Sequence, residues 1–472
     1  MKTQRLTIFF KKTQRKYVPL LLIALFGLFL DSCKVKETDI SPVSPAIDTS
    51  PADKFSAEVA TKWADLQLQL TKTTAGYTPP VASRAYALGG LVMYEAVVGG
   101  LTSNQSLAGQ LTALTTLPTP ETGKEYNWAL SANAAEATML RALYAEVSRP
   151  QAVVNKRVID SVEVVLKNSY KVSVAQDVID RSEKLGQDIA NAIFEWSKSD
   201  GGHEGYKRNF PATYVVPVFD GAWQTTENGQ KIPMQPTWGA NRTFVPANQN
   251  MTIPTPIPFS ASLVSPYFAT YFEVYTKNKS LTDEEKAIAV WWADNPVETF
   301  TPPGHSYNIA NIAVKQTKVG LGKAAEVFAR TGITVNDAFI NCWKCKFKFN
   351  NERPYTMLRR TVDANWKPFW PAPPFPGFPS GHATQSGAVS AVLTDFFGDN
   401  FAFVDDSHVG RGNDATTGIA FKARSFKSFS QFATESANSR FYGGIHTRQD
   451  NEKGLAEGQK IGKNVIALKF KK

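Results

Sequence analysis

Cysteine is scarce in this sequence, with only three residues among 472. Cys342 and Cys345 lie three positions apart, and Cys33 lies near the N-terminus. This number excludes a small disulfide-stapled scaffold, and a chain of this length can bury one large or two medium cores. The Cys-x-x-Cys pair lacks the βαβ pattern of thioredoxin-like proteins, and no further Cys or His lies at a spacing that would complete a zinc site. A local disulfide and two buried thiols both remain open for this pair.

Strand-like alternation is also rare, whereas alanine is abundant and apolar residues recur at spacings of three and four. This helical pattern occupies 55–72, 82–99, 127–144, 178–198, 283–295, 305–331 and 335–349, and it returns after Pro379 and from about Ser425 to the end. It predicts an all-α fold of helical bundles in two packed halves. The N-terminal half comprises residues 55–199 and the C-terminal bundle residues 263–472. Between them, residues 200–262 are rich in Pro, Gly and aromatic residues without a helical period, which predicts a lid or a surface wrap.

Long basic tracts are absent from most of the chain. The formal net charge is +10, but six basic residues and one acidic residue lie within residues 1–32, so their removal lowers it to +5. A mildly basic chain without Lys/Arg-rich runs does not have the composition of a nucleic-acid-binding protein. Concentrated positive charge is better explained here by a pocket for a small anion.

No apolar run is long enough for a stable membrane-spanning helix. The segment "LLLIALFGLFL" follows the six basic residues and has the length of a secretory h-region. Cys33 comes directly after it in "LDSCK", which resembles a bacterial lipoprotein signal. The resemblance implies a signal peptide over residues 1–32, a diacylated Cys33 and a flexible tether over residues 33–54. We therefore expect an exported protein of a bacterial cell envelope, in the outer membrane, that touches the membrane only through its lipid anchor.

The segment Phe375 to Gly387, "FPGFPSGHATQSG", brings Ser380, Gly381 and His382 to the start of a predicted helix. The first backbone amides of a helix attract anions, and glycine permits close approach. An ordinary Ser cap with a surface histidine would give the same local pattern. The segment by itself therefore leaves an oxyanion site and a simple cap equally open.

Two other segments carry matching chemistry. Lys346 precedes Arg353 by seven positions, and Arg440 precedes His446 by six. Asp450 lies four residues beyond His446, a spacing that places both on one helix face, so the carboxylate can orient the imidazole. Two guanidinium groups and one ammonium can neutralise a tetrahedral oxyanion. Each pair alone would usually be a solvated helix face or a structural ion pair, but together the segments predict an oxyanion site.

These segments resemble the three motifs shared by the type 2 phosphatidic acid phosphatase superfamily and the vanadium-dependent haloperoxidases. The matching positions are Lys346, Arg353, Pro354, Pro379, Ser380, Gly381, His382, Ser439, Arg440, His446 and Asp450. The resemblance implies a helical-bundle fold and a site for vanadate, which phosphate can also occupy. It implies that Lys346, Arg353 and Arg440 grip the oxygens, that Ser380 and Gly381 add hydrogen bonds, and that His382 is the acid or base. His446 would bind the central atom and Asp450 would orient it.

The motifs do not separate a haloperoxidase from a phosphatase, because both require the same trigonal-bipyramidal cradle. In a phosphatase His446 would attack phosphorus and His382 would protonate the leaving oxygen. In a haloperoxidase His446 would ligate vanadate, and His382 would take a proton from hydrogen peroxide. The segments "TPPGHSYNIA" and "CWKCKFKFNNERP" are similar to bacterial haloperoxidase-like proteins, and the likeness extends over most of residues 55–472. We therefore expect a vanadate-dependent haloperoxidase, with a phosphomonoesterase as the alternative and an oxyanion-binding lipoprotein without turnover as a third interpretation.

Halide would meet two aromatic side chains. Trp343 and Phe375 lie where the resemblance places residues beside the halide, although core packing would explain them equally well. An apolar wall lowers the cost of desolvating the halide, and bromide or iodide is expected because each is easier to oxidise than chloride. The resemblance also places His305 near the pocket, where a hydrogen-bonded core histidine is the alternative interpretation. The sequence does not determine the organic acceptor or the oligomeric state.

Overall fold

The fold is described from a computed structural model for residues 50–226 and 230–472. The predicted signal peptide, Cys33 and most of the predicted tether lie outside the described residues. The last residues assigned to the tether, Pro51–Lys54, form a short 3-10 helix (η1) in which Ala52 is buried. Within the described ranges no helix has the length and apolar character needed to cross a membrane.

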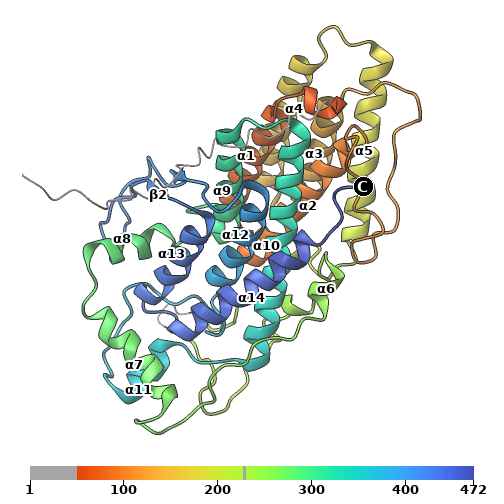
Figure 1. Cartoon of the computed structure of the whole chain (residues 1–472). Coiled ribbons are helices and arrows are strands. Elements are labelled where there is room, and N and C mark those ends of the chain that lie inside the picture. The colour runs from red at the N-terminus through yellow and green to blue at the C-terminus, as the bar shows by residue number, and fades with distance from the viewer. Residues whose placement is uncertain (1–49, 227–229) are drawn as a thin grey trace, which may run out of the picture. The chain divides into compact units, whose positions relative to one another are not determined.

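Helices dominate the described residues, as the sequence predicts, and Figure 1 shows them packed along one another. The predicted all-α class is confirmed, since the only strands in the described residues are the three-residue pair β1 (Phe403–Asp405) and β2 (Arg424–Phe426). The helices are α1 (Glu58–Thr73), α2 (Pro79–Val98), α3 (Trp128–Tyr144), α4 (Arg149–Tyr170), α5 (Gln176–Ser197), α6 (Pro246–Gln249), α7 (Pro266–Asn278), α8 (Asp283–Trp291), α9 (Thr301–Thr317), α10 (Leu321–Phe349), α11 (Pro354–Thr361), α12 (Gly381–Phe397), α13 (Phe429–Tyr442) and α14 (Arg448–Ile466).

The longest helix, α10, joins the two predicted halves. It packs along α2 of the N-terminal half, and both contribute to one hydrophobic core. The approach is close because Gly90 of α2 faces the Phe328 carbonyl and Gly332 of α10 faces the Tyr86 carbonyl, where a Cβ would lie 2.2 and 2.4 Å from oxygen. Glycine at both crossing points therefore lets the backbones of α2 and α10 touch.

A second close pair, α12 with α14, carries Gly381, His382 and Asp450 of the predicted site. A Cβ on Gly458 of α14 would lie 2.1 Å from the Thr384 carbonyl of α12. Helix α13 packs against both helices and against α8. The start of α12 and the start of α14 are thereby brought to the same region, next to the end of α10.

Several helix boundaries differ from the sequence pattern. Residues 305–331 were expected as one helix, but α9 ends at Thr317 because Lys318 adopts a left-handed conformation (φ 50°), and α10 begins at Leu321. From Leu321 onward the segment belongs to the same helix as residues 335–349, so α10 runs without a break to Phe349. The pattern also missed α4, which has few buried residues, and the short helices α7 and α11.

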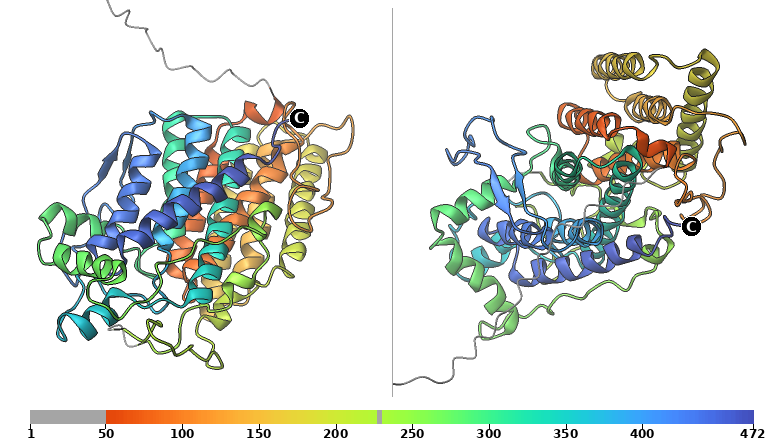
Figure 2. Two further views of the ribbon diagram at one scale, coloured as in Figure 1. Left: turned by 60° about the horizontal axis from the view of Figure 1, so that its bottom comes forward. Right: turned by 45° about the horizontal axis from the view of Figure 1, so that its top comes forward.

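The segment from 200 to 262 is irregular apart from α6 and the short 3-10 helices η2 (Gly205–Arg208) and η3 (Trp238–Ala240). Figure 2 shows it as yellow-green loops outside the bundled helices. It follows α10 closely: the Phe244 and Val245 amides donate to the Asp337 carboxylate at 2.8 and 3.0 Å. Around Phe244 the segment therefore runs along the outside of the bundle and is hydrogen-bonded to α10.

Candidate oxyanion site

The motif residues come from five neighbouring elements. Lys346 lies in the last turn of α10, Arg353 caps α11, and Ser380 caps α12. Arg440 lies in the last turn of α13, and Asp450 lies in the first turn of α14. A cavity of about 280 Å³ opens among them, and the predicted site residues on its wall are Trp343, Phe375, Gly381, His382, Arg440 and His446.

Lys346 lies fully buried behind this cavity wall. Its ammonium donates to the carbonyls of Pro376, Gly377 and Pro379 at 2.9, 2.9 and 2.6 Å. Burial lowers the pKa of Lys346 to about 7. Only the protonated amine can make three such bonds at once, so the carbonyls oppose the effect of burial. Lys346 thus fastens the loop that leads into α12, as well as supplying positive charge.

The two arginines are buried as well. Arg353 donates from Nε to the Phe375 carbonyl at 3.0 Å and from Nη1 to the Ile445 carbonyl at 2.9 Å. Arg440 donates from Nη1 to the Trp292 carbonyl at 2.9 Å. Burial lowers the pKa of Arg440 to about 10, so the guanidinium remains charged at neutral pH.

His446 and Asp450 form the predicted pair. Asp450 Oδ2 accepts from the Thr447 amide at 3.0 Å and lies 3.0 Å from His446 Nδ1. Because this carboxylate oxygen is an acceptor, His446 carries its proton on Nδ1 and a lone pair on Nε2. Burial, followed by the charge of Arg353, holds the pKa of His446 well below its usual range. The lone pair of Nε2 accepts from Arg353 Nη1 at 3.0 Å, so a metal ion bound at this nitrogen would take the place of that hydrogen bond.

The helix N-terminus has the predicted geometry for an anion. The Ser380 hydroxyl caps α12 by accepting from the Ala383 amide at 3.4 Å, while the Ser380 amide donates to the Asp450 carbonyl at 3.0 Å. Gly381 is the first residue of α12, where a backbone N–H has no acceptor within the helix. A Cβ at Gly381 would meet only Trp343 at 3.7 Å and Cys342 at 4.0 Å. Gly381 lines the cavity, so a ligand there can approach the start of α12.

His382 presents an unsatisfied nitrogen. Its Nε2 is buried without a hydrogen-bond partner among the described residues, while the ring makes a hydrogen bond to the Trp292 backbone. The donor in that bond is therefore Nδ1, which leaves a lone pair on Nε2. Burial, followed by the charge of Arg440, holds the pKa of His382 well below its usual range. His382 is thus a neutral proton acceptor on the cavity wall.

Trp343 and Phe375 form one side of the cavity. Their ring centroids are 4.9 Å apart, and both side chains are buried. Trp343 Nε1 donates to the Met234 carbonyl at 3.2 Å, which ties the 200–262 segment to this wall. An apolar wall beside charged groups excludes water and strengthens electrostatic interactions at the site.

These groups fit vanadate or another tetrahedral oxyanion. Lys346 and Arg440 are buried cations, and in the described part of the chain neither lies within ion-pair distance of a carboxylate. A buried charge is stabilised further by an ion of opposite charge bound beside it. Gly381, His382 with its unsatisfied nitrogen, and His446 line the same cavity, which is therefore suited to bind the anion.

The sequence pattern missed a group of polar residues at this cavity, one of which, Asp294, lines it. Asp294, Asp405 and His408 are buried beside His305, and ligand atoms of Asp294, His305 and His408 lie within 4.8 Å of one another. No motif spacing connects them, because Asp294 and Asp405 are more than one hundred residues apart. His305 is indeed a hydrogen-bonded buried histidine, bonded to Asp294 and Asp405.

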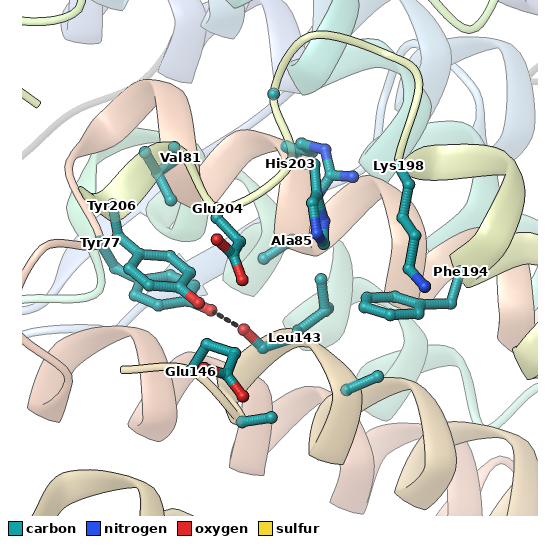
Figure 3. A pocket seen from close by; sticks show the side chains of 15 residues that line it. Tyr77, Val81, Ala85, Leu143, Glu146, Phe194, Lys198, His203, Glu204 and Tyr206 are labelled. Carbon is teal, nitrogen blue, oxygen red and sulfur yellow. Dashed lines mark hydrogen bonds between the residues drawn. The ribbon is translucent and has the colours of Figure 1, made fainter. Parts of the chain in front are cut away.

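Larger cavities lie elsewhere. One of about 370 Å³ lies against α2, α3 and α5, where the Tyr77 and Tyr206 rings stack on one side and Phe194 and Lys198 lie on the other (Figure 3). None of the motif residues lines this cavity, so we assign it no part in the oxyanion site. Cys342 and Cys345 are free buried thiols, which leaves no disulfide at this pair.

Comparisons with known proteins agree with this geometry. Residues 326–471 match the family model described as the VCPO second helical-bundle domain. Over 138 residues the chain is 30% identical to vanadium chloroperoxidase from Curvularia inaequalis, which covers 24% of this chain and 23% of that relative. The match to this curated relative therefore spans less than a quarter of its length.

Solved structures match over far more of the chain. The structure described as the first bacterial vanadium-dependent iodoperoxidase has a TM-score of 0.74 and 31% identity, covering 87% of this chain and 96% of that one. A bacterial vanadium-dependent chloroperoxidase in its holo form has a TM-score of 0.63 and 17% identity, covering 84% and 92%, and shows likeness of fold alone. The chain belongs to the vanadium-dependent haloperoxidase family, whose members are peroxidase-type enzymes.

Proposed function

We propose that this protein is a vanadate-dependent haloperoxidase that oxidises bromide or iodide with hydrogen peroxide to hypohalous acid. The observation that carries the proposal is the pair of buried cations, Lys346 and Arg440. Among the described residues neither has a carboxylate within ion-pair distance, and both lie beside a cavity that His382 and His446 line. The 31% identity to an iodoperoxidase supports iodide or bromide as the halide. Phosphate can bind in the same cradle, because it is also a tetrahedral oxyanion.

In this proposal the cation groups of Lys346, Arg353 and Arg440 neutralise the oxygens of vanadate. The Ser380 hydroxyl and the Gly381 amide would add hydrogen bonds. His446 would ligate vanadium through Nε2, with Asp450 fixing the tautomer and the direction of the ring. Bound vanadate would supply a Lewis acid that polarises peroxide toward attack by halide.

His382 would act as the general base and then as the general acid. Its neutral ring has a lone pair at Nε2 on the cavity wall, so it can accept a proton from hydrogen peroxide as peroxide binds. The overall reaction converts one halide, one peroxide and one proton to hypohalous acid and water, and His382 can return its proton to the leaving oxygen. Trp343 and Phe375 would exclude water and lower the cost of desolvating the halide.

The decisive test is an assay series on the purified chain from residue 34, loaded with orthovanadate and supplied with peroxide and iodide, bromide or chloride in turn. Iodide oxidation is followed by triiodide absorbance, and bromide or chloride oxidation by halogenation of monochlorodimedone. We expect turnover with iodide or bromide that depends on vanadate. Hydrolysis of p-nitrophenyl phosphate with no halide turnover would instead establish a phosphatase with His446 as nucleophile, and oxyanion binding without either activity would establish a binding protein.

We further propose that the chain is exported and anchored through Cys33, on the basis of the sequence before it. Hypohalous acid would then be released in the cell envelope, where it can reach a small organic acceptor. Fractionation of cells that express the full chain, with Cys33→Ser as the comparison, tests the anchor. Equal membrane association of both proteins would contradict it.

A further inference from the structure

Four buried titratable side chains lie together outside the family motifs. His305 in α9 approaches Asp294 Oδ2 with Nδ1 at 2.9 Å and Asp405 Oδ2 with Nε2 at 2.8 Å. His408 Nε2 lies 3.0 Å from Asp294 Oδ1. All four side chains are almost completely shielded from solvent. We call Asp294, His305, Asp405 and His408 the Asp-His tetrad.

The hydrogen-bond pattern assigns the protons. Carboxylate oxygens accept at both ring nitrogens of His305, so each nitrogen carries a proton and the ring is an imidazolium. Burial lowers the pKa of His305, but the charges of Asp294 and Asp405 outweigh it and raise the pKa to about 10. Burial lowers the pKa of His408, which as a neutral ring donates from Nε2 to Asp294. The tetrad therefore satisfies its own donors without a metal ion.

Trp292 connects the tetrad to the catalytic cavity. Its ring stacks on His305 with centroids 4.3 Å apart and planes inclined by 23°, and its Nε1 donates to Glu435 at 3.0 Å. Its carbonyl accepts from Arg440 at 2.9 Å and is the backbone acceptor for the His382 ring. One peptide carbonyl thus orients both a predicted vanadate-binding residue and the predicted base.

The backbone next to Trp292 needs external support. Asp294, Val297 and Thr301 all have left-handed φ angles, of 50°, 62° and 67°. Such conformations are unfavourable for residues other than glycine, especially β-branched ones, and persist only where the surroundings enforce them. The two histidines that bond Asp294, together with the ring of His305 against Trp292, hold this backbone between α8 and α9 in place. Helix α8 in turn packs against α13, as Figure 1 shows.

We propose that His305 is a positioning residue for halide oxidation: through the tetrad it fixes Trp292, whose carbonyl holds Arg440 in place and keeps the His382 proton on Nδ1. The consequence for turnover rests on the proposed function, whereas the effect on the His382 ring does not. Without the imidazolium, Asp294 loses a charged partner and the Trp292 ring loses its stacking surface. The Trp292 carbonyl then shifts, and His382 exchanges freely between tautomers.

Nitrogen NMR of histidine tests the positioning directly, because the sequence contains only five histidines. The protein is labelled with ¹⁵N at the histidine rings, and parent, His305→Gln and the control His203→Gln are compared without vanadate. In the parent we expect His305 protonated on both nitrogens from pH 6 to 8 and His382 in a single Nδ1–H tautomer. His305→Gln should give a mixed His382 tautomer, and His203→Gln should not. His382 shifts identical in parent and His305→Gln would overturn the proposal.

Kinetics of the vanadate-loaded protein supply the second readout. We expect His305→Gln to lower kcat for halide oxidation at least tenfold and to shift the pH profile of kcat/KM for peroxide, while His203→Gln matches the parent. Unchanged kcat and pH profile in a folded His305→Gln protein would contradict the proposal. A parent without halide turnover would refute the proposed function alone, since the NMR comparison still decides whether His305 positions His382.

Two further measurements remove ambiguity. If His305→Gln does not fold, Asp405→Asn removes one carboxylate partner of His305 with little change of shape, and the same His382 tautomer mixing is expected. Metal analysis of the parent should find no stoichiometric divalent ion. One equivalent of zinc whose chelation moves the His305 and His408 resonances would show a metal site and overturn the proposal.

Discussion

Lys346 and Arg440 differ from the surface cations of this protein because they are buried and have no carboxylate partner within residues 50–226 and 230–472. Surface lysines such as Lys156 and Lys184 pair with aspartates one helical turn away. Lys346 instead donates to three carbonyls and Arg440 to one, so neutral dipoles replace a counter-ion. An anion that enters the cavity meets charge that is already desolvated, which makes the electrostatic attraction strong.

The first prediction concerns the proposed vanadium ligand. His446→Ala should weaken vanadate binding by about a hundredfold or more and abolish halide turnover. Mutation of a residue that only hydrogen-bonds a metal ligand already lowers metal affinity about ten- to a hundredfold, and loss of the ligand itself should cost more. Equilibrium dialysis against orthovanadate measures the affinity. His203→Ala, a partly exposed histidine of the distant cavity, is the matched control and should bind as the parent does. Equal affinities for parent and His446→Ala would refute the assignment.

Lys346 gives a second prediction at this scale. Lys346→Ala should weaken vanadate and phosphate binding roughly ten- to a thousandfold, because loss of one buried charge contact costs about 2 to 5 kcal/mol. Its three carbonyl partners are left without a donor, so some loss of thermal stability is expected as well. Lys348→Ala, at an exposed position of the same helix, should change neither quantity. Unchanged oxyanion affinity in Lys346→Ala would show that its charge does not act on the ligand.

At the scale of elements, close helix pairs place the site residues. The crossing of α12 with α14 depends on Gly458, and it brings the Ser380 amide within hydrogen-bond distance of the Asp450 carbonyl. The helix that presents the anion-binding N-terminus is therefore bonded directly to the helix that orients His446. Displacement of either helix would separate the two parts of the site.

The third prediction tests this crossing. In Gly458→Ala the new Cβ would lie 2.1 Å from a backbone oxygen, so α12 and α14 must move apart. We expect a loss of unfolding free energy of about 1 to 3 kcal/mol or more, together with weaker vanadate binding. Denaturant unfolding and dialysis measure the two effects. Gly412→Ala, where nothing lies within 4 Å of the added Cβ, should change neither by more than about 0.5 kcal/mol.

At the scale of the whole molecule, the two predicted halves share one core through α2 and α10, and buried ionisable groups couple its stability to pH. The pKa of His305 is raised to about 10, above its unfolded value of about 6.5, so the folded state binds the extra proton between these values. Its contribution to stability is complete below about pH 6.5 and is lost as pH rises toward 10.

The fourth prediction follows from this loss of stability with rising pH. The difference in unfolding free energy between parent and His305→Gln should be largest near pH 6 and should shrink by a few kcal/mol by pH 10. Urea unfolding of both proteins at pH 6, 8 and 10 provides the measurement, and groups that titrate alike in both cancel. A difference that stays constant or grows with pH would mean that His305 is not charged in the folded protein.

Local sequence was sufficient for the helical class and for much of the candidate site. Helical spacing is a property of neighbouring residues, so most long helices could be predicted, whereas α4 was missed because it presents few buried residues. The motif residues could be named because their chemistry is concentrated in three short segments. The break at Lys318 depends on a single left-handed residue, which leaves no trace in the hydrophobic period.

Tertiary structure alone decided which distant groups meet. The tetrad joins residues of three segments, the loop after α8, helix α9 and the β1 end, and only the folded chain brings His305 between Asp294 and Asp405. The same packing directs the Trp292 carbonyl to Arg440. The sequence by itself determined the helical class and the residue types available for oxyanion chemistry, because both are encoded locally. Their distances, protonation states and supporting partners depended on the fold, because burial and electrostatic interaction are properties of the packed molecule.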